Sequence, residues 1–199
     1  MGYPSFFDDV ESVKLVDPLA DILGAFEDGE YEITFKEVVK SAGHSCPTVA
    51  GAYLITAEAL KALYPDELAV RGEIKVEFSD PLEEGVAGVI SNVVTQITGA
   101  TDKSGFKGLA GNFARHSLMY FRADINSSAR FTRVDSDKSV DVFYDPSSIA
   151  PSPNMGPLMQ KMMGGMASQD EVKEFGNLWQ DRVKRIFENT SSVVKVVEV

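Results

Sequence analysis

Apolar and polar residues alternate along the chain in patterns that predict both helices and strands. Thr34 and Glu37 have the spacing of a capping box, which opens a short helix that Gly43 ends. Residues 48–63 are rich in Ala, Leu, Val and Ile and predict a buried helix, which stops before Pro65. These two helices form a pair joined by a tight turn.

The middle of the chain predicts a β-sheet and one more helix. Residues 73–78 alternate between polar and apolar, as in a half-buried strand, and residues 86–98 form a helix rich in Val and Ile. A strand follows at 117–125, and residues 129–134 and 140–144 predict a hairpin. These elements indicate an α+β fold in which the helical pair packs on a mostly antiparallel β-sheet.

The N-terminal residues carry weaker signals. Residues 1–16 show little pattern, although Phe6 and Phe7 are expected to lie against the core. Asp17 and Pro18 begin a short helix, as its cap and its first residue. No strand is predicted in this part of the chain.

The C-terminal quarter differs in composition from the α+β core of residues 1–150. Prolines mark a linker, and methionines crowd into residues 151–190, which we assign to a helical extension. Ser168 and Glu171 form a second capping box, which opens a helix with one apolar face. Residues 191–199 are rich in the β-branched residue valine and predict a closing strand of the core sheet.

The methionines of this extension need a surface that covers their apolar side chains. We expect Met159, Met162 and Met163 to face a pocket of the core, so that the extension closes over it as a lid. Two alternatives are a contact with a partner subunit and a Cu(I) site built from thioether sulfurs.

Composition and charge argue against several classes of function. The chain has 199 residues, enough for one core with an extension, and its net charge of −11 argues against binding nucleic acid or an anionic membrane. We expect no signal peptide and no membrane-spanning helix, because no apolar run has the required length or flanks. The single cysteine allows no intrachain disulfide, which fits a cytoplasmic location.

The candidate chemistry lies in the turn between the paired helices. This turn holds His44 and Cys46, the only cysteine. Pro47 is favoured at a first helical position, which puts Cys46 at the N-cap, where the helix dipole favours the thiolate form. A thiolate beside an imidazole makes either a transition-metal site or a nucleophile with its base. The structural alternative is a small buried cysteine and a hydrogen-bonded histidine at a helix cap.

Two other features are candidates for the same site. The glycine-rich loop at 99–111 offers backbone N–H groups to an anion, assisted by Lys103 and Lys107, although a plain connection has the same composition. His116 is the other histidine, and it is either a third metal ligand or a structural residue at the edge of a strand.

The turn also carries a family resemblance. The run from Gly43 to Pro47, with Gly51 beyond it, resembles the Gly-His-x-Cys-Pro-Gly motif of the FmdE family, which is named after a component of formylmethanofuran dehydrogenase. A second block, residues 92–101, resembles that family's helix running into a Gly-x-Thr loop, and the likeness covers roughly residues 33–145.

Three positions depart from the family pattern. Thr48 stands in place of a glycine, Asn92 in place of an acidic residue, and Ala100 in place of the second cysteine of some members. The single cysteine also excludes the zinc-finger tail that some members carry. These departures argue against a redox role that needs a partner thiol.

The resemblance implies a site and partners. It implies a homodimer that holds one transition metal ion through His44 and Cys46, with Gly99 and Thr101 near the same pocket. Zinc is favoured, and nickel and iron also accept imidazole and thiolate ligands. Two protein ligands leave positions for water or a small-molecule substrate. The family name implies association with a molybdenum or tungsten formylmethanofuran dehydrogenase-type enzyme of one-carbon metabolism.

Three functions therefore stay open at this point. One is the metal site, catalytic or not. Another is a metal-free enzyme in which Cys46 is the thiolate nucleophile and His44 is its base. The last is a non-catalytic module that binds a cofactor or small anion between Cys46 and the 99–111 loop. The patterns do not decide whether the protein is an enzyme.

Overall fold

The computed structural model describes residues 2–199 and confirms the α+β fold. The helices are α1 (Pro18–Ile22), α2 (Phe35–Ala42), α3 (Pro47–Leu63), α4 (Ala87–Thr98), α5 (Met155–Met163), α6 (Gln169–Glu188) and α7 (Thr190–Val193), with short 3-10 turns η1 (Ser5–Asp8), η2 (Glu27–Gly29) and η3 (Pro146–Ser148). The strands are β1 (Val13–Val16), β2 (Glu30–Ile33), β3 (Ala69–Val70), β4 (Ile74–Glu77), β5 (Met119–Tyr120), β6 (Ala129–Arg133), β7 (Ser139–Tyr144) and β8 (Val194–Glu198). They form a three-stranded sheet in the order β2-β1-β3 and a five-stranded sheet in the order β5-β4-β6-β7-β8.

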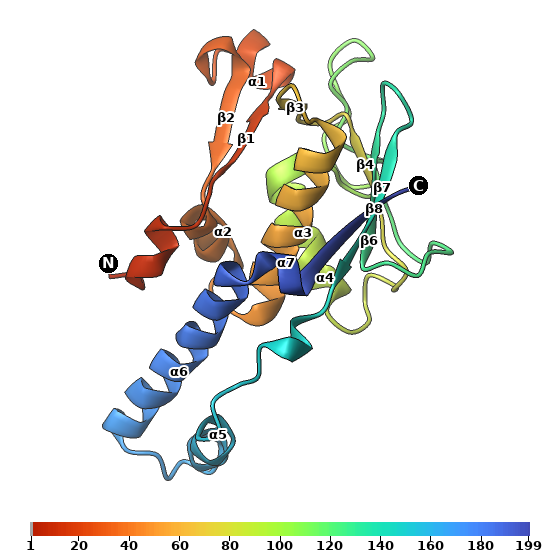
Figure 1. The fold of residues 1–199 in the computed structure, drawn as a ribbon. Coiled ribbons are helices and arrows are strands. Elements are labelled where there is room, and N and C mark those ends of the chain that lie inside the picture. Colours follow the sequence, from red (N-terminus) through yellow and green to blue (C-terminus); the bar gives the residue numbers. More distant parts are fainter. Residues whose placement is uncertain (1) are drawn as a thin grey trace.

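Helix α3 is the centre of the fold (Figure 1). It packs against α2 and α4, and its other side meets β6, β7, β8 and α6. Val49, Ala50 and Tyr53 of α3 are almost completely buried. A helix that is apolar around most of its circumference is stable only when other elements cover it. The prediction that the helical pair packs on the sheet is thus confirmed. The five-stranded sheet is mostly antiparallel, as predicted, since only its β4–β5 pair is parallel.

Capping contacts define the helix ends as predicted. The Thr34 hydroxyl accepts the Glu37 N–H and the Glu37 carboxylate accepts the Thr34 N–H, and Gly43 ends α2 in the left-handed conformation with φ 75°. Ser168 and Glu171 make the same reciprocal pair at the start of α6. These contacts satisfy N–H groups that a helix leaves without internal partners.

The strand predictions need two corrections. The strand expected at 117–125 is only β5, because Ser117 and Arg122 adopt left-handed backbone on either side of it, with φ 58° and 63°. Strands β1 and β2 lie in the N-terminal region for which no strand was predicted, and four residues each are too few for alternation to stand out. Phe6 and Phe7 are buried in the core, as expected.

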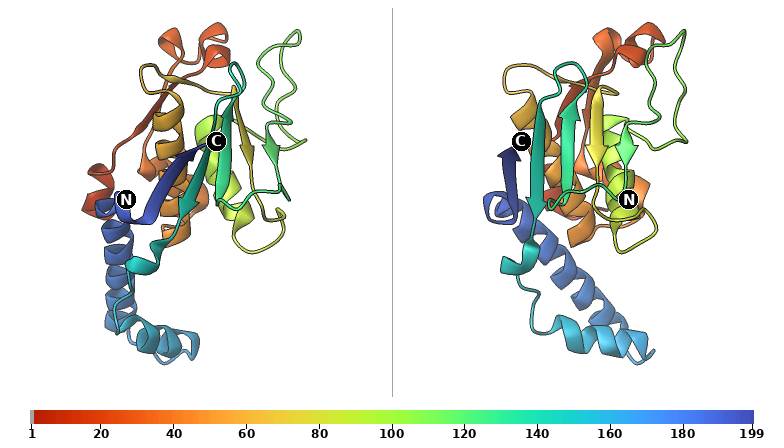
Figure 2. Two further views of the ribbon diagram at one scale, coloured as in Figure 1. Left: turned by 45° about the vertical axis from the view of Figure 1, so that its right-hand side comes forward. Right: turned by 90° about the vertical axis from the view of Figure 1, so that its right-hand side faces the viewer.

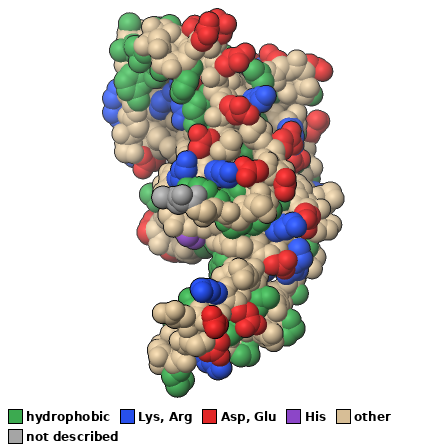
Figure 3. All heavy atoms as spheres, turned by 90° about the vertical axis from the view of Figure 1, so that its left-hand side faces the viewer, with side chains coloured by type: hydrophobic (Ala, Val, Ile, Leu, Met, Phe, Trp, Pro, Cys, Tyr) green, Lys and Arg blue, Asp and Glu red, His purple; other side chains and the backbone are tan. Residues whose placement is uncertain are grey.

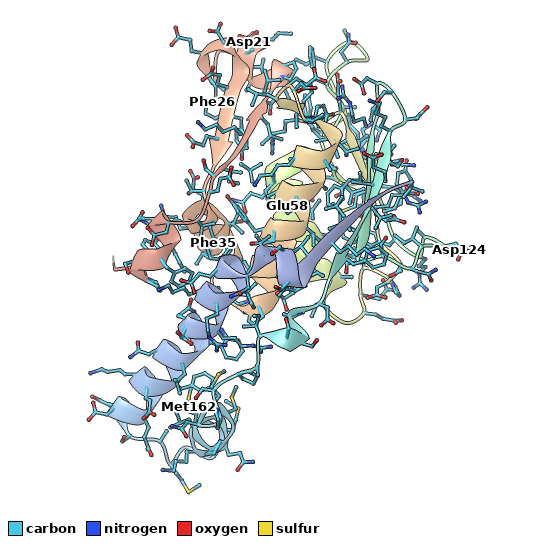
Figure 4. The ribbon with its side chains drawn as sticks, viewed as in Figure 1. Asp21, Phe26, Phe35, Glu58, Asp124 and Met162 are labelled. Carbon is cyan, nitrogen blue, oxygen red and sulfur yellow. The ribbon has the colours of Figure 1, made fainter. Side chains whose placement is uncertain are left out.

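The C-terminal extension forms an arm rather than a lid. The second half of α6 packs on α3, whereas α5 and the first half of α6 pack on each other and project from the body (Figures 1 and 2). Met162 lies on this arm, away from the core (Figure 4), and Met163 is 77% exposed. The prediction that Met163 faces a pocket of the core is wrong. Hydrophobic side chains lie at the tip of the arm in Figure 3.

A buried ion cluster ties the N-terminal region to the body. The carboxylate of Asp17, 4% exposed, caps α1 by accepting the N–H groups of Leu19 and Ala20. It also accepts hydrogen bonds from Arg71 at 2.9 Å and from the buried Arg115 at 2.6 Å. Burial by itself raises the pKa of the Asp17 carboxyl, but the hydrogen bond from Arg71 and the charge of Arg115 outweigh burial and lower it.

Replacing Asp17 by Ala should therefore lower the free energy of unfolding by about 3–5 kcal/mol, because Arg115 is left buried without its counter-charge. A carboxyl whose folded pKa is lowered stabilises the fold above its ordinary value of 3.8, and this contribution disappears as the pH falls through the folded pKa. Urea titrations at neutral and acidic pH measure both effects. The difference between wild type and Asp17→Ala should shrink in acid, and a constant difference would contradict the linkage.

Candidate metal centre at the α2–α3 turn

The turn between α2 and α3 carries both His44 and Cys46. Cys46 has extended backbone, with φ −151° and ψ 169°. Successive side chains along extended backbone point to opposite faces. Ser45 is accordingly buried at 8% exposure, His44 on its N-terminal side is exposed, and Cys46 is half-buried. Both candidate ligands are thus at least partly accessible, whereas Ser45 between them is buried.

The imidazole of His44 is held in one orientation. Its Nδ1 atom lies 3.0 Å from the carbonyl oxygen of Ala42. A carbonyl only accepts hydrogen bonds, so Nδ1 must carry the proton. In the neutral ring Nε2 is then unprotonated and has a free lone pair. A histidine whose second ring nitrogen donates to a carbonyl is the usual arrangement of a metal ligand.

Cys46 occupies the N-cap of α3, as predicted. Its sulfur accepts the N–H of Val49 at 3.4 Å, and Pro47 follows at the first helical position. This is the place where a helix offers unpaired N–H groups and the positive end of its dipole. The thiolate is the form of cysteine that binds metals or attacks electrophiles.

Three side chains from distant parts of the chain fix the backbone on both sides of Cys46. Trp179 Nε1 and Gln180 Nε2, on α6, donate to the carbonyl of Ser45 at 2.9 and 3.3 Å. The hydroxyl of Tyr144, at the end of β7, donates to the carbonyl of Pro47 at 2.7 Å. Burial raises the pKa of the Tyr144 phenol, so it keeps its proton and remains a donor. We call Tyr144, Trp179 and Gln180 the clamp.

Gly51 lets the clamp approach α3 closely. A Cβ atom at this position would lie 2.3 Å from Cε1 of the Tyr144 ring, far inside van der Waals contact. The glycine that contributed to the family resemblance therefore has a physical reason in this fold. Sequence analysis missed the clamp, because no local pattern connects Ser45 with side chains more than one hundred residues away.

A groove of about 370 Å³ lies beside His44, between the end of α2 and α4. Its lining contains amide, hydroxyl and apolar groups but no charged side chain; it consists of Ser41, Ala42, His44, Val89, Asn92, Val93, Thr95 and Gln96. Asn92, which stands where the family has an acidic residue, is thus brought to the same groove as His44. Its amide oxygen is a further possible ligand atom.

The 99–111 loop is not brought to this turn. Gly99 caps the C-terminal end of α4 with φ 76°, about 10 Å along the helix axis from Asn92 at 1.5 Å per residue. The Thr101 hydroxyl donates to the carbonyl of Arg115 at 2.7 Å. The loop lies at the end of the molecule opposite to the first turn of α3 (Figures 1 and 2). Gly99 and Thr101 have structural roles there.

The loop also contains a carboxylate that occupies some of its own hydrogen-bond donors. The carboxylate of Asp102 accepts the N–H and the hydroxyl of Ser104 at 2.8 and 2.6 Å, and these hydrogen bonds lower its pKa. The ammonium of Lys107 donates to the carbonyl of Lys103 at 2.7 Å. A loop that already coordinates a carboxylate has fewer free donors for an external anion, so the predicted anion cradle finds no support in these contacts.

His116 does not complete the metal site. Its Nδ1 lies 2.9 Å from the hydroxyl of Ser117, next to Arg115, which is anchored on Asp17. Among residues 2–199, no three His, Cys, Asp or Glu side chains gather closely enough to hold a metal ion. The prediction of His116 as a third ligand beside His44 and Cys46 is therefore wrong.

No protein-family model matches the sequence, and no curated protein is significantly similar to it. The geometry of the turn consequently carries the functional argument. In the part of the chain that the structure describes, no helix is long and apolar enough to cross a membrane. Acidic and basic side chains are interspersed on the face shown in Figure 3, without a continuous basic patch.

Replacing Gly51 by Ala should lower the free energy of unfolding by about 1–3 kcal/mol, because the new methyl group overlaps the Tyr144 ring. Alanine has the higher helix propensity, so a stabilisation would show that the ring is free to move away. Thermal and urea unfolding measure the change. The double variant Gly51→Ala with Tyr144→Leu removes the overlapping ring and should recover part of the loss.

Proposed function

We propose that the α2–α3 turn binds one transition metal ion through Nε2 of His44 and Sγ of Cys46. The observation that carries this proposal is the clamp, which fixes the backbone carbonyls on both sides of Cys46. A site gains affinity and geometric selectivity when its ligands are held in place before the metal arrives.

The chemistry of the donor set supports zinc as the first choice. Zinc accepts imidazole nitrogen and thiolate sulfur in tetrahedral sites, and nickel and iron accept the same atoms. Since residues 2–199 offer no third His, Cys, Asp or Glu, the other positions fall to water, a bound small molecule or the Asn92 amide. An open position of this kind lets a metal polarise a substrate or activate water.

The resemblance to the FmdE family supports the same site. The motif residues Gly43, His44, Cys46 and Gly51 each have a defined place in the turn. On this basis we place the protein with the molybdenum or tungsten enzymes of one-carbon metabolism, as a metal-binding homodimer.

Metal loss in variants tests the site. Cys46→Ser and His44→Ala should each lose the bound metal, from about one ion per chain to background, while the fold is retained. Serine is a better N-cap than cysteine, so Cys46→Ser should be at least as stable as wild type. The matched control is His116→Ala, which should keep its metal. Elemental mass spectrometry of the purified proteins measures the content, and equal content in all four would refute the site.

A metal-free nucleophile is the second candidate, because a cysteine at a helix N-cap, here with the Val49 N–H at its sulfur, can attack an electrophile without any metal. Alkylation of Cys46 by iodoacetamide separates the two. If the thiolate binds zinc, added zinc should slow alkylation by about tenfold or more, and a chelator should restore the rate. An alkylation rate that ignores both zinc and chelator would favour the metal-free nucleophile.

A further inference from the structure

A second groove, of about 690 Å³, has no lining residue in the α2–α3 turn. Its walls are formed by the N-terminal segment, α3, the end of α6, α7 and β8, and Figure 4 labels Glu58, which α3 contributes to it. It shares no residue with the groove beside His44. Pockets that bind small molecules usually have about 300–1,000 Å³. The size of this groove therefore fits a small organic molecule.

The floor of this groove is apolar and is held in place by the core. Phe6, Leu54 and Val194 line it, and each is at most 9% exposed. Phe187 also lines it, and its ring packs edge-on against Phe35 with the ring centroids 4.7 Å apart. Side chains fixed in this way need no rearrangement to cover the apolar part of a ligand. Burial of that part on the floor then supplies the affinity.

The rim of the groove carries more acidic than basic side chains. Four carboxylates and two ammonium groups line it, which leaves two negative charges in excess. Lys61 donates to Glu11 at 2.7 Å and to Glu58 at 3.2 Å. Lys184 lies 3.5 Å from Glu188. Both ammonium groups are thus already paired, and neither is free to bind the charged end of an anionic ligand.

Asp9 supplies the fourth carboxylate of the rim, and it has no counter-charge. It is exposed at the end of η1, and no Lys, Arg or His among residues 2–199 forms an ion pair with it. The neighbouring Asp8, by contrast, pairs with Lys36. An apolar floor below an acidic rim matches a molecule with an apolar body and one cationic end, because the excess charge attracts cations and repels anions.

We propose that this groove binds a small cationic amphiphile, which is a molecule with an alkyl or aryl body and one ammonium group. The body lies on the floor formed by Phe6, Leu54 and Val194, and the ammonium group stays at the acidic rim. Exposed ion pairs are weak, so the carboxylates select the sign of the ligand's charge more than they add affinity. Fatty acids and phosphorylated molecules are disfavoured, because they bring an anion to a rim without a free cation. The inference does not depend on metal at the α2–α3 turn.

Three probes with the same alkyl chain test the charge preference: octylammonium, octanol and octanoate, at neutral pH and below the concentrations at which they aggregate. Amide resonances of the isotope-labelled full-length protein report where each probe binds. Octylammonium should shift the amides of Val10, Ala57 and Ser191 in a saturable manner. Its affinity should exceed that of octanoate by about tenfold or more, with octanol between them. Equal affinities for octylammonium and octanoate, or no saturable shift, would overturn the proposal.

A bulky substitution locates the site. Ser191 is exposed and lines the groove, so Ser191→Trp places a large side chain there and should abolish saturable binding of octylammonium. Ser192→Trp is the matched control, because Ser192 is also exposed but is not part of the lining. Circular dichroism checks that both variants are folded. Unchanged binding in a folded Ser191→Trp would place the ligand elsewhere and overturn the assignment.

Charge removal tests the rim. Asp9→Asn combined with Glu188→Gln leaves two carboxylates and two ammonium groups in the lining. The preference for octylammonium over octanoate should then fall by about fivefold or more. Asp124→Asn removes an exposed carboxylate that lies far from Glu58 in Figure 4, and it should leave the preference unchanged. A preference that persists in the double variant would contradict the role of the rim.

Discussion

The fold depends on the burial of α3. Its apolar side chains face almost every direction, and each fully buried Val or Leu contributes about 1.5–3 kcal/mol. No single layer is able to cover such a helix, so α2, α4, α6 and the five-stranded sheet must all be recruited around it. The turn with His44 and Cys46 is the start of this helix, and its position is therefore set by the whole core.

This placement explains how an exposed turn becomes rigid. The first turn of α3 emerges where β7 ends and where α6 crosses the body, and these elements bring Tyr144, Trp179 and Gln180 to the backbone around Cys46. The same packing requires Gly51. The clamp thus connects the packing of the core to the backbone geometry of the turn, where His44 is exposed and Cys46 is half-buried.

Much of the fold was predictable because its signals are local. Capping residues, helix periodicity and strand alternation depend on neighbours a few positions apart, so α2, α3, α4, α6 and the β6–β7 hairpin followed from the sequence. Strands β1 and β2 were too short to show a pattern, and β5 is cut short by left-handed residues that carry no glycine signal. At the candidate site, the spacing of His44 and Cys46 drew attention to the turn. Pro47, which is favoured at a first helical position, predicted the N-cap role of Cys46. The clamp, the groove and the separation of Thr101 and His116 from the turn depend on tertiary packing, which a local pattern does not contain.

The clamp donates to main-chain carbonyls and makes no use of the side chains of the residues it holds. The side chains of the turn add local contacts to the clamp, because Cys46 caps α3 and His44 bonds to the carbonyl of Ala42. A replacement at position 46 that still accepts the Val49 N–H, such as Ser or Asp, would keep this cap while the clamp continues to hold the backbone. The turn thus offers protein engineers a backbone held from outside, in which donor sets that preserve the helix cap can be compared.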